Sequence, residues 1–159
     1  MSLQQRIQID IATAMRGGDA LRRDVLRMAS SAAHYAEKRN GRPLTEDDLL
    51  AVLSREVKTR RESVEAFRGG GREDLATKEE AEIAILSEYL PQPLTEPEID
   101  DLVRQAVAAT GAASARDMGK VMGWLAPRTR GRADGKHVSE LVGQALAKAD
   151  LSAHDGGRH

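Results

Sequence analysis

Apolar residues recur along the chain at intervals of three and four positions, which is the spacing of helices with one buried face. No stretch shows the sustained every-second-residue alternation of a half-buried strand. The pattern therefore predicts an all-α fold of about seven helices. With their capping residues, the predicted helices cover residues 2–17, 19–40, 45–67, 72–90, 95–111, 114–127 and 134–149.

Residues that cap helices stand in front of several of these runs. Ser2 with Gln5, and Thr95 with Glu98, match capping boxes, in which two side chains bind free backbone amides of the first turn reciprocally. Asp19 can accept a hydrogen bond from the first turn of the second run. These signals predict helix starts directly after Ser2, Asp19 and Thr95.

Two prolines divide the helical runs into two groups. The segment Leu90-Pro91-Gln92-Pro93-Leu94 cannot continue a helix, because proline lacks an amide proton and its ring clashes with the preceding turn. We therefore expect an N-terminal helical bundle over residues 1–92 and a small C-terminal three-helix subdomain over residues 93–150. Residues 151–159 are expected to be disordered.

Composition narrows the classes of function. The chain contains no cysteine, which excludes a disulfide framework, thiolate zinc sites and cysteine nucleophiles, and is compatible with a reducing cytoplasm. No apolar run at the N-terminus is long enough for a signal peptide, and none later approaches the ~20 residues of a membrane span. We therefore expect a soluble, cytoplasmic protein without membrane contact.

Motifs that carry catalysis are absent from the sequence. There is no HExxH or GxSxG, and no phosphate-binding glycine loop in front of a lysine. The histidines are scattered, and the glycines at 69–71 are followed by acids, the wrong sign for binding phosphate. We expect no enzymatic activity, no cofactor and no metal site.

Charge is segregated along the chain, although the net value is only −1. Residues 1–72 carry +4, residues 73–115 carry −8 and residues 116–137 carry +4. Cations of the third helical run, Arg60 among them, are expected to face solvent in neighbouring-turn salt bridges. Basic zones suit a polyanion, whereas the acidic helices of residues 73–115 suit a protein partner or a second copy.

The basic segment 116–137 holds the candidate binding residues. Its helical part places Arg116, Lys120 and Trp124 on successive turns, and Pro127 is expected to end the helix before Arg128. In an extended loop, arginines at every second position would point to one side and match phosphate oxygens. The alternative is a solvated, mobile loop. The candidate residues are Arg116, Lys120, Trp124, Arg128, Arg130, Arg132 and Lys136.

Other residues of the segment bear on its geometry. Trp124 is the only tryptophan and can either stack on a base or ribose or pack against the next helix. The N-terminus of the last helix would attract an anion, but Asp134 can cap it and partly occupy that position. Gly119 and Gly123 would let another backbone approach closely. Structural turn residues Gly131 and Gly135 are expected to have positive φ.

Four segments closely resemble the GatB/YqeY family, over about residues 2–148. They are RMASSAAHYAEK, REVKTRRESVEAFRGGGREDL, KEEAEIAILSEYLPQPLT and GAASARDMGKVMGWLAPRTRGRADGKHVSELV, of which MGKVMG and GRADGK are the most specific. The chain looks like a stand-alone YqeY-like protein. Its C-terminal part is similar to the tail domain of the B subunit of the glutamine-dependent Asp/Glu-tRNA amidotransferase.

The resemblance implies a helical, non-catalytic module that binds tRNA or associates with an amidotransferase. By matching motif positions it implies contacts from Lys120, Arg128, Arg130, Arg132 and Lys136. A carbon-nitrogen ligase label would be inherited by family resemblance only. Two alternatives stay open at this stage: a helical protein-interaction adaptor, and an accessory to carbon-nitrogen ligase activity.

Overall fold

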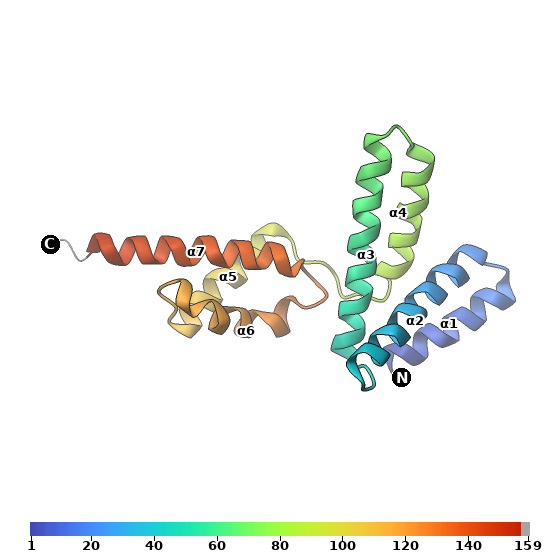
Figure 1. Cartoon of the computed structure of the whole chain (residues 1–159), viewed down its shortest axis with the longest axis horizontal. Coiled ribbons are helices and arrows are strands. Elements are labelled where there is room, and N and C mark those ends of the chain that lie inside the picture. The colour runs from blue at the N-terminus through green and yellow to red at the C-terminus, as the bar shows by residue number, and fades with distance from the viewer. Residues whose placement is uncertain (157–159) are drawn as a thin grey trace. The chain divides into compact units, whose positions relative to one another are not determined.

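The computed structural model describes residues 1–156, and this part of the chain is helical with no strand. Seven α-helices and one short 3-10 turn, η1, follow one another along it (Figure 1). The predicted all-α fold is confirmed. The helices are α1 Leu3–Gly17, α2 Ala20–Asn40, α3 Glu46–Gly69, α4 Glu73–Ser87, α5 Glu96–Thr110, α6 Met118–Thr129 and α7 Gly135–Gly156, with η1 at Ala115–Asp117 between α5 and α6.

The predicted capping residues begin these helices. The hydroxyl of Ser2 accepts a hydrogen bond of 3.1 Å from the backbone amide of Gln5, whose side chain accepts one of 3.0 Å in return. Thr95 and Glu98 form the same reciprocal pair at the start of α5. Asp19 accepts a bond from the first turn of α2. Each cap satisfies amides that have no partner inside their own helix.

Contacts within the described chain divide it into two compact units, Met1–Pro91 and a second that begins at Gln92. The division falls in the proline segment. In the first unit, α1 and α2 form one antiparallel hairpin, and α3 and α4 form another (Figure 1). In the second unit, α7 packs along α5 and α6.

The core of the first unit is aliphatic, with one tyrosine. Its buried members are Ile7, Ile11, Val25, Leu26, Ala29, Ala33, Leu49, Leu53, Val57, Ile85, Leu86 and Tyr89. The hydroxyl of Tyr89 donates a hydrogen bond to the Asp10 carboxylate, and Arg6 lies over the tyrosine ring. Burial and the neighbouring carboxylate raise the pKa of Tyr89 well above its usual value, so the hydroxyl keeps its proton.

A buried arginine between α3 and α4 corrects one prediction. Arg60 was expected to face solvent, but its side chain is only 6% exposed. It donates hydrogen bonds of 2.8 Å to Glu56 and 3.1 Å to Glu82, and these carboxylates compensate the burial of its charge. The partner on α4 is far away in sequence, so helical spacing within α3 did not predict this pair.

The core of the second unit is built by the last three helices. Its buried members are Ile99, Val103, Ala106, Val121, Leu125, Val138, Val142 and Leu146. α7 continues to Gly156, so the predicted disorder is wrong for residues 151–156, while residues 157–159 lie outside the described part. The helix continues because no proline or left-handed glycine interrupts it at residue 150.

Candidate nucleic-acid interface

The residues before α6 orient the start of the basic segment. The hydroxyl of Ser114 accepts a hydrogen bond from the Arg116 amide, and the Asp117 carboxylate accepts bonds from the amides of Ala113 at 2.9 Å and Ser114 at 3.4 Å. These backbone bonds lower the pKa of Asp117. Nζ of Lys120 lies 3.9 Å from Asp117, a loose and exposed ion pair that leaves the ammonium group accessible.

α6 has one buried and one exposed face. Val121 and Leu125 are fully buried, and the buried hydroxyl of Thr129 donates to the Leu125 carbonyl at 3.1 Å. Gly119 and Gly123 lie on the exposed side, where a Cβ added at either position would meet no heavy atom within 4 Å. Within the described chain, no neighbouring helix fills the space beside this glycine pair. The pair instead leaves the helix backbone uncovered beside Lys120.

Pro127 lies inside α6, so the prediction that it ends the helix is wrong. The helix continues to Thr129, and the amide of Arg130 donates to the Ala126 carbonyl at 3.0 Å. Proline removes the amide that would bind the carbonyl of Gly123 and places its ring next to that carbonyl. Gly123 is exposed, so solvent can reach the carbonyl that has lost its partner.

The continued helix places Arg128 directly over Trp124. The guanidinium carbon lies 3.6 Å from the ring centre, and Nη1 donates a hydrogen bond of 2.6 Å to the Trp124 carbonyl. The other part of the indole packs against the core of the second unit. Of the two roles considered for Trp124, the structure shows packing, with one ring face covered by an arginine rather than open to a base.

The remaining arginines do not form a one-sided row. Arg130 caps α6 and is exposed, whereas Nε of Arg132 donates to the Gln92 carbonyl at 3.0 Å. The carbonyl of Arg132 also accepts a hydrogen bond of 2.8 Å from the Leu94 amide. Arg132 thus holds the segment that precedes α5, and the expected extended array of Arg128, Arg130 and Arg132 is wrong because Arg128 is helical.

The two glycines predicted to form the turn between α6 and α7 differ in backbone conformation. Gly131 has φ of 74°, in the left-handed region that favours glycine. Gly135 is not among the positive-φ residues and begins α7, so the expectation is wrong for Gly135. The carboxylate of Asp134 accepts a hydrogen bond of 3.2 Å from the Lys136 amide. This N-terminus is therefore already capped by a negative charge and is a poor anion site.

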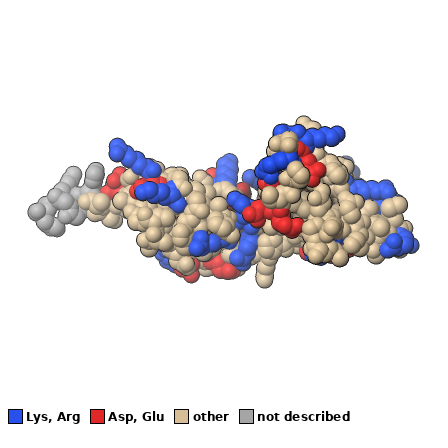
Figure 2. Space-filling view, turned by 90° about the horizontal axis from the view of Figure 1, so that it is seen from below, with Lys and Arg blue, Asp and Glu red and all other residues tan. Residues whose placement is uncertain are grey.

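Cations of the basic segment differ in their pairing. Within the described residues, no carboxylate forms an ion pair with Arg116, Arg128 or Lys136. By contrast, arginines of the first unit such as Arg22 and Arg68 are held by Glu88 and by Glu73 with Glu80. Figure 2 shows lysine and arginine side chains projecting from the C-terminal unit into solvent. The unpaired cations remain available for phosphate oxygens.

One ion pair of the second unit was not predicted from the sequence. Nε2 of His137, at the start of α7, lies 2.9 Å from the Glu96 carboxylate at the start of α5. The hydrogen bond and the negative charge raise the pKa of His137 above its ordinary value. The two residues are 41 positions apart, and no local pattern pairs them.

No three His, Asp or Glu side chains of the part with described side chains gather so that they could hold a metal ion. No helix of that part is long and apolar enough to cross a membrane.

Comparison with known proteins identifies the family. A family model described as Yqey-like protein matches residues 4–146. The chain belongs to this YqeY-like family. It is 32% identical over 145 residues to the protein named altered inheritance of mitochondria protein 41, mitochondrial, of Pyrenophora tritici-repentis, covering 89% of this chain and 79% of the relative. The protein of the same name from Lachancea thermotolerans is 30% identical, covering 84% and 75%.

A third relative carries no functional name. It is an uncharacterized protein of Schizosaccharomyces pombe, 35% identical over 92 residues, which are 57% of this chain and 74% of the relative. The family description and the names of these relatives state no catalytic activity.

Proposed function

We propose that this YqeY-like protein is a non-catalytic tRNA-binding protein. Its contact surface is the α6 surface, defined here as Arg116, Lys120, Trp124 and Arg128, with Arg130 and Lys136 at its border. The observation that carries the proposal is the stacking of Arg128 on Trp124, without any carboxylate partner in the described chain. A guanidinium fixed in this way presents a preorganised set of donors to a phosphate.

The geometry of α6 supports contact with a nucleic-acid backbone. Lys120 and Arg128 are exposed on α6 and Trp124 lies between them at four-residue steps, so the three form one line along the helix, which Arg116 precedes in the 3-10 turn η1. Gly119 and Gly123 add no side chain beside this line, which lets a ribose-phosphate strand come close to the helix. The ligand we propose is tRNA rather than another polyanion, because these positions belong to the motif that resembles the amidotransferase tail domain.

The net negative charge of residues 73–115 suggests the alternative role as a protein-interaction adaptor, but the structure weakens this argument. Most carboxylates of residues 73–115 have an arginine or histidine partner in the structure. The paired carboxylates are Glu73, Asp74, Glu80, Glu82, Glu88, Glu96 and Asp101. Their negative charge is largely compensated within each unit, so it opposes tRNA binding less and offers less to a basic partner.

A binding assay with matched variants tests the proposal. Total tRNA labelled with a fluorophore is titrated with the intact chain at low salt, and binding is followed by anisotropy. The triple variant R116A/K120A/R128A should bind at least about tenfold more weakly. The control variant R16A/R61A/K78A removes the same charge from exposed positions of the first unit and should bind like the natural chain.

Two outcomes would refute the assignment. The natural chain could fail to bind tRNA at low salt, or both triple variants could lose affinity equally, which would indicate unspecific attraction by net charge.

We further propose a cytoplasmic location and no carbon-nitrogen ligase activity. Cell fractionation with an antibody against the chain tests the first, and glutaminase and ATP hydrolysis assays on the pure protein test the second.

A further inference from the structure

A groove runs between α2 and α3 in the first unit, whereas the residues proposed to contact tRNA belong to the second unit. Two of its lining residues, Ala36 and Val52, form an aliphatic floor that is almost fully buried. The complete lining is Ala32, Tyr35, Ala36, Arg39, Val52, Arg55 and Glu56. None of these residues has a role in the proposed function.

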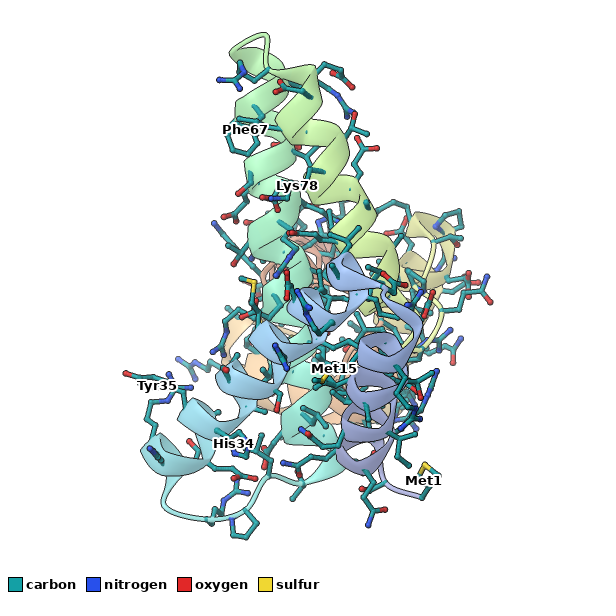
Figure 3. The ribbon with its side chains drawn as sticks, turned by 90° about the vertical axis from the view of Figure 1, so that its right-hand side faces the viewer. Met1, Met15, His34, Tyr35, Phe67 and Lys78 are labelled. Carbon is teal, nitrogen blue, oxygen red and sulfur yellow. The ribbon has the colours of Figure 1, made fainter. Side chains whose placement is uncertain are left out.

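Large apolar side chains are exposed along this groove. Tyr35 is 69% exposed, and Met28, about two turns earlier in α2, is 55% exposed. Figure 3 shows Tyr35 pointing away from α2 into solvent. Exposed apolar groups beside a groove with an aliphatic floor mark surfaces that other molecules cover. Methionine adapts to the shape of a partner, and tyrosine combines an apolar ring with a hydrogen-bonding tip.

The edges of the groove carry positive charge, because the acidic residue that lines it is already paired inside the protein. Glu56 lines the groove, but its carboxylate is bound by the buried Arg60 at 2.8 Å. Arg60 also contacts the sulfur of Met28 at 3.9 Å, which ties the methionine to the fixed pair beneath it. Arg39 and Arg55 have no carboxylate partner in the described chain. The groove therefore presents two uncompensated positive charges at its edges.

We infer that this groove binds an amphipathic helix of a partner protein, with acidic residues beside its apolar side. Such a helix places apolar side chains three and four residues apart, which matches a groove between two helices. Its carboxylates would pair with Arg39 and Arg55, and its apolar side chains would cover Tyr35, Met28 and the floor. Charge complementarity selects an acidic partner over a basic one.

Single-stranded RNA is the competing occupant, and the structure favours it less. Binding of successive bases uses several aromatic platforms in a row, whereas Tyr35 is the only aromatic side chain that lines this groove. The floor, formed by Ala36 and Val52, is aliphatic and offers no further surface for base stacking. The inference does not depend on tRNA binding, because it concerns another unit and other residues.

Peptide selection on the intact chain tests the inference. A displayed library of helical peptides of about four turns is selected on the natural protein, and enriched sequences are synthesised with a fluorophore. We expect amphipathic sequences rich in Asp and Glu. Their affinity should fall at least about tenfold for Tyr35→Ala and for R39E/R55E. It should be retained in R39K/R55K, and also in the control R16E/K78E, which makes the same charge change on other exposed positions.

The remaining outcomes overturn the inference. These are a selection that enriches nothing, enriched peptides without acidic residues, and binding that is equal in R39E/R55E and the control. Binding of polyuridylate that is lost in Tyr35→Ala and R39E/R55E would assign the groove to nucleic acid instead. Thermal melting followed by circular dichroism keeps the comparison valid, because all substituted side chains are exposed and each variant should melt like the natural chain.

Discussion

The guanidinium group of Arg128 lies 3.6 Å from the centre of the Trp124 ring and donates a hydrogen bond of 2.6 Å to the carbonyl of the same tryptophan. Both contacts arise because α6 continues through Pro127, which keeps the two residues one turn apart. The arginine is thereby held on the outer side of α6 and still has free N–H groups. Within one helical turn, Trp124 packs against the core and holds Arg128, the candidate phosphate contact, on the surface.

The only tryptophan of the chain gives a direct optical signal for this arrangement. We expect added tRNA to change the fluorescence of Trp124, because a phosphate that binds Arg128 alters the charge over the indole ring. Arg128→Ala should shift the emission to longer wavelength, since it uncovers one ring face to water. Arg16→Ala is the control, because it lies in the first unit, which contains no tryptophan. Identical spectra for the natural chain and Arg128→Ala would contradict the stacking.

The two turn glycines should respond to alanine in opposite ways. Gly131→Ala should lower the free energy of unfolding by about 1 kcal/mol or more, because its φ of 74° disfavours a side chain. Gly135→Ala should leave the stability unchanged or raise it by up to about 1 kcal/mol, because the residue is helical. A Cβ at Gly135 also meets no heavy atom within 4 Å. Urea denaturation of both variants makes the comparison, and equal losses would contradict it.

Local patterns predicted most of the fold, because their physical causes lie within a few residues. The capping box of Thr95 and Glu98 spans one helical turn, and both partners are visible in the sequence. The contacts of Arg60 with Glu82 and of Arg132 with Gln92 span 22 and 40 positions and depend on how helices pack. A sequence pattern holds no information on such pairs, so the burial of Arg60 was predicted wrongly and the contact of Arg132 with Gln92 was not predicted.

Pro127 shows a different limit of sequence analysis. Proline in a helix costs a hydrogen bond and crowds the preceding turn, so a helix end was expected there. The buried contacts of Leu125 and Thr129 on either side of the proline favour one continuous helix, and an exposed Gly123 lowers its cost. The balance between these terms depends on tertiary packing. Because packing favours the continuous helix, Arg128 is helical, and this determines the shape of the candidate site.

The buried pair of Arg60 and Glu82 should contribute to the stability of the first unit. Glu82→Gln keeps the shape of the side chain but removes the charge that binds Nε of Arg60 at 3.1 Å. We expect a loss of about 1–3 kcal/mol in the free energy of unfolding, because one hydrogen bond to a charged group is weakened while Glu56 still holds the arginine. Glu65→Gln, an exposed change on α3, should have little effect in the same denaturation experiment.

The ion pair of His137 with Glu96 makes part of the stability of the second unit depend on pH. The pKa of His137 is raised in the folded state, mainly by the hydrogen bond to Glu96, so folding favours the protonated form. The stabilisation is therefore fully present below the unfolded value of about 6.5 and is lost as pH rises through the folded value. His137→Gln should melt with a flatter pH dependence across this window. Added salt should reduce the difference, because both side chains are accessible to solvent. Parallel pH profiles of the natural chain and the variant would contradict this linkage.

The salt dependence of tRNA binding gives the sharpest test of the α6 surface. Each phosphate contact that a variant loses should flatten the plot of log affinity against log salt concentration by roughly 0.7–0.9. R116A/K120A/R128A should therefore lose about 2 units of slope if all three cations contact phosphate. Arg132→Ala should change the slope less than Arg128→Ala, because Nε of Arg132 is bound to the Gln92 carbonyl, which holds this side chain at the segment before α5 rather than along α6.

This pair of variants separates two explanations of binding. If Arg132→Ala flattens the slope as much as Arg128→Ala does, the side chain of Arg132 leaves Gln92 in the complex and the extended row of arginines forms on tRNA. If only the α6 variants flatten it, the contacts follow the helix as the folded chain presents it. A slope that none of these substitutions changes would mean that tRNA is bound elsewhere, and the α6 surface would lose its proposed role.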